Sequence, residues 1–269
     1  MRNVIRLLKS ENIINRLAKE ITKGKILNPK EDPIQPIVDI IHGSIMKYDL
    51  ETTRVGLKAV TDQVTKIIEP GREVEISSHF CHHLERVSRL AISKMDEESA
   101  IEVIESIGNF GLSTARKGLG VSTWYAVVSL GSVGGDAARK GLAHAAWEVA
   151  ESLGIVGIAT AEEGHVTRQA VRTLRYIGKV TAERGLGSVI VGAARSLVVV
   201  GTIAIKNGLE DVTRQAAEAL AEVTILSEET VKDDIQNYEE SILKEKDRES
   251  FKKFMKIYEQ ELEKLRAEK

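Results

Sequence analysis

Glycines recur at a nearly fixed interval through the middle of this chain of 269 residues. One series has spacings of 23, 23, 24 and 23 residues and consists of Gly108, Gly131, Gly154, Gly178 and Gly201. A second, offset series has spacings of 23, 23, 21 and 23 residues and consists of Gly118, Gly141, Gly164, Gly185 and Gly208. About 23 residues accommodate five turns of helix and a short connection. The spacing therefore predicts one helix in each interval.

The second series indicates where the helices end. Its members mostly follow a basic or polar residue and precede leucine, as in Lys117-Gly118-Leu119. This pattern is typical of a glycine in the left-handed conformation just after a helix. Gly164 departs from it, because two glutamates precede it. No proline follows Pro70, which favours uninterrupted helices.

The first series falls inside the predicted helices, where a glycine costs about 1 kcal/mol relative to alanine. We interpret these glycines as places where the backbones of neighbouring helices approach closely. A ligand that approaches the backbone is the alternative.

A longer repeat indicates that the structural unit is a pair of helices. Thr167-Arg168-Gln169-Ala170 recurs 46 positions later as Thr213-Arg214-Gln215-Ala216. In this period, residues 97–226 resemble an α-solenoid of the HEAT and armadillo type. The resemblance implies an all-α superhelix of about ten to twelve antiparallel helices, with a period of 23 residues per helix and 46 per pair.

Three segments are expected: an N-terminal helical segment (1–48), the helical repeats (49–226) and a charged C-terminal helical cap or tail (227–269). Asp49, Asp96 and Asp211 are predicted helix N-caps. Before the tail, helices are expected near 3–22, 34–47, 50–69, 74–94, 97–117, 122–140, 143–163, 166–184, 188–207 and 211–226.

The N-terminal part carries a second, looser resemblance. Asp32-Pro33-Ile34-Gln35-Pro36-Ile37-Val38-Asp39-Ile40, followed by Thr52 and Thr53, is similar to a motif in the soluble region of prokaryotic predicted membrane proteins of unknown function. This resemblance implies a cytoplasmic module related to a membrane-attached protein and implies no activity.

The composition narrows the class of protein. The formal net charge of −2 argues against a nucleic-acid-binding protein, which usually has a strongly basic face. The single cysteine, Cys81, fits a reducing compartment, and we expect a cytoplasmic protein without a signal peptide. Abundant Glu, Lys and Ile beside only 7 Asn and 6 Gln favour an archaeal or thermophilic source.

One cluster of possible metal ligands stands out: His79, Cys81, His82 and His83. On a helix, His79 shares a face with His82 and His83, whereas Cys81 points away from that face. A catalytic zinc site needs a third protein ligand. We therefore expect a polar helix face with a buried thiol, no bound metal and no cofactor, and keep a metal-dependent enzyme as an alternative.

A row of arginines and glutamines is the candidate binding site. It consists of Arg168, Gln169, Arg172, Arg175, Arg214 and Gln215. The three arginines between 168 and 175 share one helix face, because their spacings are four and three. Such helices commonly line the concave surface of a solenoid, where extended partners bind. The row predicts a groove for a protein or acidic peptide, and local ion pairs on a solvated face are the alternative.

Two apolar stretches raise the questions of membrane association and of assembly. Residues 188–205 are almost entirely apolar apart from Arg195, which favours a helix buried between its neighbours over one that spans a membrane. Aromatic residues recur in 248–269, and this stretch is expected to dock in the same chain or to form a coiled coil with a second copy. A homodimer through either stretch is therefore a hypothesis.

Taken together, these features predict a protein-binding scaffold or adaptor that has no catalytic constellation. A metal-dependent enzyme using His79 to His83 and a membrane-peripheral module are the two alternatives.

Overall fold

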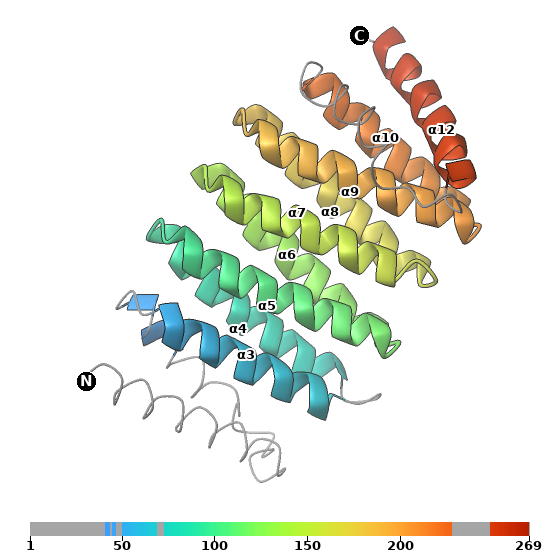
Figure 1. Cartoon of the computed structure of the whole chain (residues 1–269). Helices are drawn as coiled ribbons and strands as arrows, with labels where there is room; N and C mark the ends of the chain where they lie inside the picture. The colour runs from blue at the N-terminus through green and yellow to red at the C-terminus, as the bar shows by residue number, and fades with distance from the viewer. Residues whose placement is uncertain (1–40, 44, 47–49, 69–72, 228–247, 269) are drawn as a thin grey trace. The chain divides into compact units, whose positions relative to one another are not determined.

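The computed structural model describes residues 41–43, 45–46, 50–68, 73–227 and 248–268, and the regular structure in these ranges is entirely helical (Figure 1). The predicted helix at 3–22 and most of the one at 34–47 lie outside these residues. The bounds of the helices are α3 (Leu50–Ile67), α4 (Glu73–Ser93), α5 (Glu97–Arg116), α6 (Gly120–Lys140), α7 (Ala143–Ala159), α8 (Gly164–Glu183), α9 (Gly187–Lys206), α10 (Glu210–Leu226) and α12 (Arg248–Ala267).

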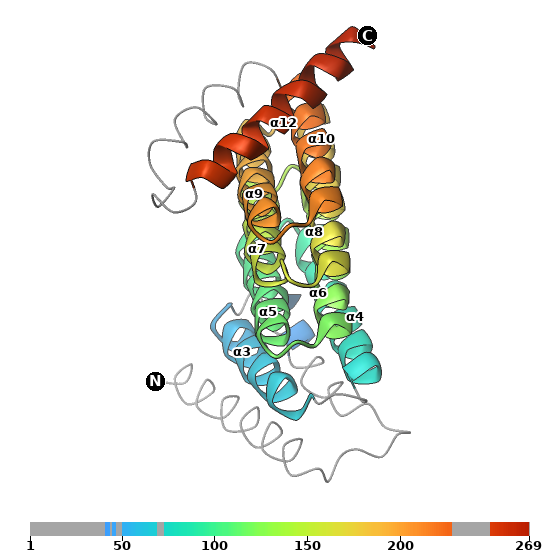
Figure 2. The same cartoon turned by 90° about the vertical axis from the view of Figure 1, so that its right-hand side faces the viewer.

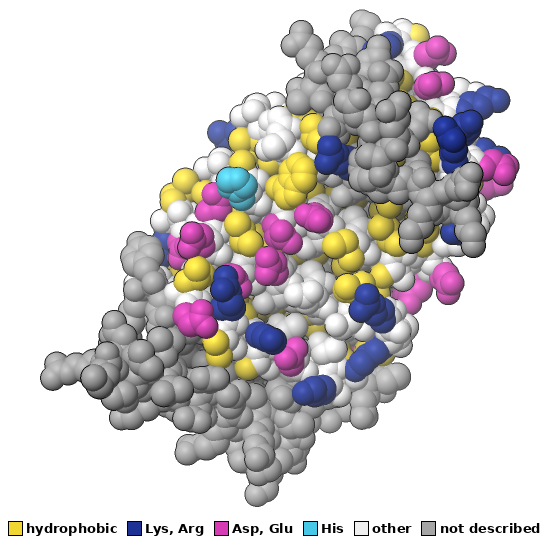
Figure 3. Space-filling model, viewed as in Figure 1, with side chains coloured by type: hydrophobic (Ala, Val, Ile, Leu, Met, Phe, Trp, Pro, Cys, Tyr) yellow, Lys and Arg dark blue, Asp and Glu magenta, His cyan; other side chains and the backbone are white. Residues whose placement is uncertain are grey.

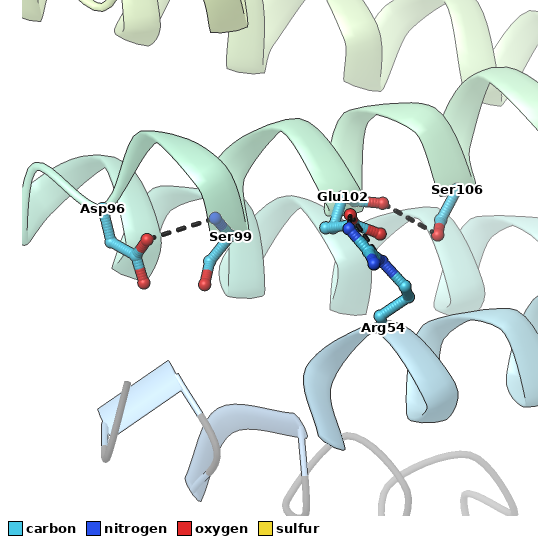
Figure 4. Close-up of polar contacts among 5 residues, drawn as sticks. All are labelled: Arg54, Asp96, Ser99, Glu102 and Ser106. Atoms are coloured by element: carbon cyan, nitrogen blue, oxygen red, sulfur yellow. Dashed lines mark hydrogen bonds and ion pairs between the residues drawn. The ribbon is translucent and has the colours of Figure 1, made fainter. Parts of the chain in front are cut away.

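The chain divides into two compact units, residues 1–129 and 130–269, and the boundary falls within α6. The predicted segments 1–48, 49–226 and 227–269 are defined by sequence pattern and not by compactness, so this division stays a prediction. In the first unit, α5 packs against both α3 and α4. Figure 4 shows Arg54 of α3 reaching Glu102 of α5, with a distance of 2.8 Å between Arg54 Nε and Glu102 Oε1.

The helices of the second unit form two layers. α7 packs against α9 in one layer and α8 packs against α10 in the other, as Figures 1 and 2 show. Consecutive helices also contact each other across the layers, since α8 packs against α7 and α9, and α9 packs against α10. The fold is therefore all-α, with consecutive antiparallel helices in contact.

Glycines with positive φ make most of the corners. Gly118, Gly141, Gly185 and Gly208 have φ between +67° and +77°, which confirms their predicted left-handed conformation. At the first of these corners, the amide of Leu119 donates to the carbonyl of Thr114, as expected for a left-handed helix end.

The corner between α7 and α8 is made differently. α7 ends at Ala159, four residues before its predicted end, and Gly164 begins α8. The hydroxyl of Thr167 in α8 donates to the carbonyl of Thr160 at 2.6 Å. A side chain of the following helix therefore satisfies a carbonyl at the end of α7.

The predicted N-caps have three different outcomes. Asp96 is confirmed, because its carboxylate accepts from the amide of Ser99 at 3.1 Å at the start of α5 (Figure 4). The N-cap predicted at Asp211 is wrong, because α10 starts at Glu210 and its cap position is Leu209. The Asp211 carboxylate pairs with Arg168 instead. Asp49 lies outside the described residues.

The glycines inside the helices form notches that receive side chains. A Cβ placed on Gly131 would lie 2.6 Å from Thr173, and one on Gly154 would lie 2.6 Å from Ser196. The space of the missing side chain is filled by a side chain of the next helix in the same layer or, at the end, of α12. The pairs are Gly131 with Thr173, Gly154 with Ser196, Gly178 with Val223 and Gly201 with Phe254. The predicted close approach of backbones is seen at Gly154, where a Cβ would lie 3.5 Å from the Cα of Ser196.

The last described helix, α12, packs on α9 and α10 of its own chain (Figure 2). Its buried residues are Phe251, Phe254 and Tyr258, and Phe254 fills the notch at Gly201. The Tyr258 hydroxyl donates to Thr224 Oγ1 at 3.2 Å, and burial is the main reason that its pKa is raised. The homodimer through 188–205 or 248–269 stays a prediction.

We expect Gly201→Ala to destabilise the protein by about 1–3 kcal/mol, because the new methyl group would overlap the ring of Phe254 and displace α12. The measurement is the urea unfolding midpoint, together with limited proteolysis of the C-terminal helix. The matched control is Gly164→Ala, where the nearest atom would be 3.7 Å away and the stability should not fall. Equal stability of the two variants would show that Phe254 does not depend on this notch.

Candidate functional site

The predicted arginines lie on α8 and α10, and two of them are held by ion pairs between these helices. Arg168 pairs with Asp211, and Arg175 pairs with Glu222, whose Oε2 lies 2.7 Å from Arg175 Nε. Lys179 Nζ lies 3.7 Å from the same carboxylate. Arg168 and Arg175 therefore join α8 to α10, as the alternative of local ion pairs anticipates.

The remaining members of the row lie in different surroundings. The side chains of Arg172 and Arg214 are exposed and make no hydrogen bond or ion pair with any residue that the structure describes. Gln169 and Gln215 are half-buried. Gln215 Oε1 is buried and has no hydrogen-bond partner within the described part of the chain. The predicted row therefore combines side chains paired between helices with side chains exposed to solvent, and its role as a binding site stays a prediction.

A basic depression of about 540 Å³ lies along α8. It includes Arg172 and Arg175 of the predicted row and leaves out the other four members. Its lining residues are Arg139, Arg172, Arg175, Tyr176, Lys179, Val180, Glu183 and Arg184. Five of them are cationic and one is acidic, so the depression favours an anionic ligand.

The wall of the depression depends on a glycine in α6. A Cβ on Gly135 would lie 2.7 Å from the ring of Tyr176, so the tyrosine lies directly against the α6 backbone. Arg139, one turn further along α6, donates from Nη1 to the Tyr176 hydroxyl at 2.5 Å and from Nη2 to Asp136 at 2.5 Å. These contacts raise the pKa of Arg139, with the bond to Asp136 contributing most.

Sequence reasoning missed four polar residues of the depression. Lys179 and Arg184 continue the spacing of three to five residues that starts at Arg172, so extending the row along the same helix would have found them. Arg139 and Tyr176 gave no such signal, because they meet across two helices.

The histidine and cysteine cluster is spread over different surroundings on α4. Cys81 and His83 are buried, whereas His79 and His82 are exposed. Burial is the main reason that the pKa of the Cys81 thiol is raised, so its reactive thiolate form is disfavoured. Among the described residues, no three His, Cys, Asp or Glu side chains are grouped so that they could hold a metal ion.

The apolar stretch at 188–205 forms most of α9. Within the described residues, this is the one helix that is long and apolar enough to cross a membrane, and 61% of its most apolar window is buried in the structure. The face viewed in Figure 3, on which α7 and α9 lie in front in Figure 1, shows hydrophobic side chains interspersed with charged ones. Core helices of soluble proteins have the same length and composition, so this finding is weak evidence for a membrane span.

The helices and their contacts define an all-helical protein. Comparison with known proteins does not assign it to a family. No protein-family model and no curated protein matches the chain. The chain is similar to that of the solved structure "DHF58 filament", with 19% identity and a TM-score of 0.36. The similarity covers 87% of this chain and 98% of that one. At this TM-score the likeness supports no conclusion about fold or function.

We expect the carboxyl of Asp211 to titrate below its ordinary pKa of 3.8, because the hydrogen bond from Arg168 stabilises the charged form. Arg168→Gln should return the pKa towards 3.8. Since the folded-state pKa is lowered, the contribution of this pair to stability is present above pH 3.8 and is lost as the pH falls through the folded-state value.

The measurement is an NMR titration of the aspartate and glutamate side-chain carboxyl carbons. Glu249 is the internal control: its pKa is lowered by Lys253 within α12, and Arg168→Gln should leave it unchanged. An Asp211 pKa that is the same in the variant and in the wild type would show that the ion pair does not persist in solution.

Proposed function

We propose that this protein is a non-enzymatic scaffold of helical repeats that binds an acidic segment of another protein on the outward face of α8. In this proposal the helices form a HEAT-like α-solenoid with a period of 23 residues per helix and 46 per pair, as the glycine series predicts. The buried thiol of Cys81 is compatible with the proposed cytoplasmic location.

The observation that carries the proposal is the basic depression along α8. The cations that line it come from α6, from α8 and from the residue that follows α8, and within the described residues Arg172 has no internal partner that would compete with a ligand. An acidic segment would supply the carboxylates that a guanidinium binds through two parallel hydrogen bonds.

Most of the lining residues are exposed to solvent, and this exposure determines the expected rate and salt dependence of binding. Tyr176 is 42% exposed, and Arg172, Lys179 and Arg184 are also exposed. Because solvent screens charges at such positions, they mainly affect the association rate and the salt dependence of binding. The proposed complex is therefore one that forms rapidly and weakens as the salt concentration rises.

The test is the affinity of the full chain for a fluorescent glutamate-rich peptide, measured by anisotropy. Arg172→Glu should weaken binding by about tenfold, because it removes a favourable charge and adds a repulsive one. Raising the salt concentration should weaken the binding of the wild type more than that of the variant.

The matched control is Arg116→Glu. The Arg116 side chain is also exposed and makes no hydrogen bond or ion pair with any described residue, but it does not line the depression. This variant has the same net charge as Arg172→Glu and should bind like the wild type. Equal weakening by both variants would mean that binding follows net charge alone, and the proposal would then fail.

A further inference from the structure

Apart from Arg139 of α6, the lining residues of the depression follow one stripe along α8 and the residue after its end. Measured from Arg172, they lie three, four, seven, eight, eleven and twelve positions further on. Residues with these spacings share one helix face over successive turns. The depression is therefore a trough along the helix, and it extends from Arg172 to Arg184.

The two ends of the trough carry the cations that have no partner. Neither the Arg172 side chain nor the Arg184 side chain makes a hydrogen bond or ion pair with any residue in the described ranges. In the middle, Arg175 and Lys179 share Glu222, while Arg139 is bound to Asp136. The three cations of the middle thus face two carboxylates and keep one uncompensated charge. The cations whose side chains have no partner lie at the two ends, with the acidic Glu183 beside Arg184.

The length of the trough follows from helix geometry. Arg172 and Arg184 are twelve residues apart, which corresponds to about 18 Å along an α-helix. An extended peptide covers about 3.3–3.6 Å per residue, so about five residues bridge this distance. A single carboxylate or phosphate group is too small to reach both ends.

We infer that the trough recognises an extended acidic protein segment at two points, with anionic side chains about five residues apart pairing with Arg172 and Arg184. Binding at both points makes the second contact intramolecular, which raises affinity without a larger interface. Tyr176 and Arg139 form a wall that is already in place, so it costs little to order on binding. This inference rests on the proposed function and adds the spacing that the partner must have.

Two peptides of identical composition test the spacing. In one, two glutamates are separated by four neutral residues; in the other, the two glutamates are adjacent. The spaced peptide should bind the full chain about fivefold more tightly, as measured by calorimetry or anisotropy. Equal affinities would overturn the inference while leaving the proposed function in place, whereas binding of neither acidic peptide would overturn both.

A double-mutant cycle then assigns each contact. Arg172→Gln and Arg184→Gln are each combined with a Glu→Gln change at one or the other end of the spaced peptide. Each arginine should couple to one peptide glutamate and not to the other, because the two ends of the trough are about 18 Å apart. Both substitutions are at exposed positions, and unchanged thermal unfolding would confirm that the variants fold.

Two results of this experiment would contradict two-point recognition. One is equal coupling of both arginines to both glutamates, and the other is no coupling at all. A single-stranded oligonucleotide serves as a competing probe, since phosphates could also bind arginines. Tighter binding of the oligonucleotide than of the spaced peptide, with the same dependence on Arg172 and Arg184, would assign the trough to nucleic acid and overturn the inference.

Discussion

The packing of alternate helices in the second unit depends on side chains that enter glycine notches. A glycine within a helix costs about 1 kcal/mol relative to alanine, so each notch needs a compensating contact. At Gly154 the compensation is visible: Ser196 fills the space and its hydroxyl donates to the carbonyl of Ala150 at 2.9 Å. Close contact also increases dispersion attraction between the helices, since they approach without an intervening Cβ.

The sequence was informative wherever a single residue has a strict backbone requirement. Left-handed corners need glycine, and the predicted conformations at Gly118 and Gly185 are confirmed by φ values of +69° and +67°. Capping is less predictable, because it depends on the exact start of the helix. Asp96 satisfies this requirement, whereas the cap position of the last repeat helix is Leu209, two residues before the predicted one. Asp211 therefore lies in the first turn of α10, and its carboxylate pairs with Arg168.

The candidate site could be predicted only in part, because its properties arise between helices. Helical spacing placed Arg168, Arg172 and Arg175 on one face, but it could not show which of them are paired. Their acidic partners lie 43 and 47 residues away, so identifying them requires the register between α8 and α10. The wall of the trough likewise requires Gly135 of α6 to lie opposite Tyr176, which no local pattern reveals.

The ion pairs that occupy Arg168 and Arg175 also determine which cations are left to bind a partner. Arg175 and Lys179 are positioned by the single carboxylate of Glu222, so they keep a fixed arrangement and one of their two positive charges is compensated. An incoming carboxylate would gain little by replacing Glu222, since that exchange only substitutes one acid for another. In the proposed complex, the side chains that can pair with an added carboxylate without displacing an internal one are Arg172 and Arg184, which lie at the two ends of the trough among the described lining residues. The proposed recognition by spacing rests on this distribution of charge rather than on the number of arginines.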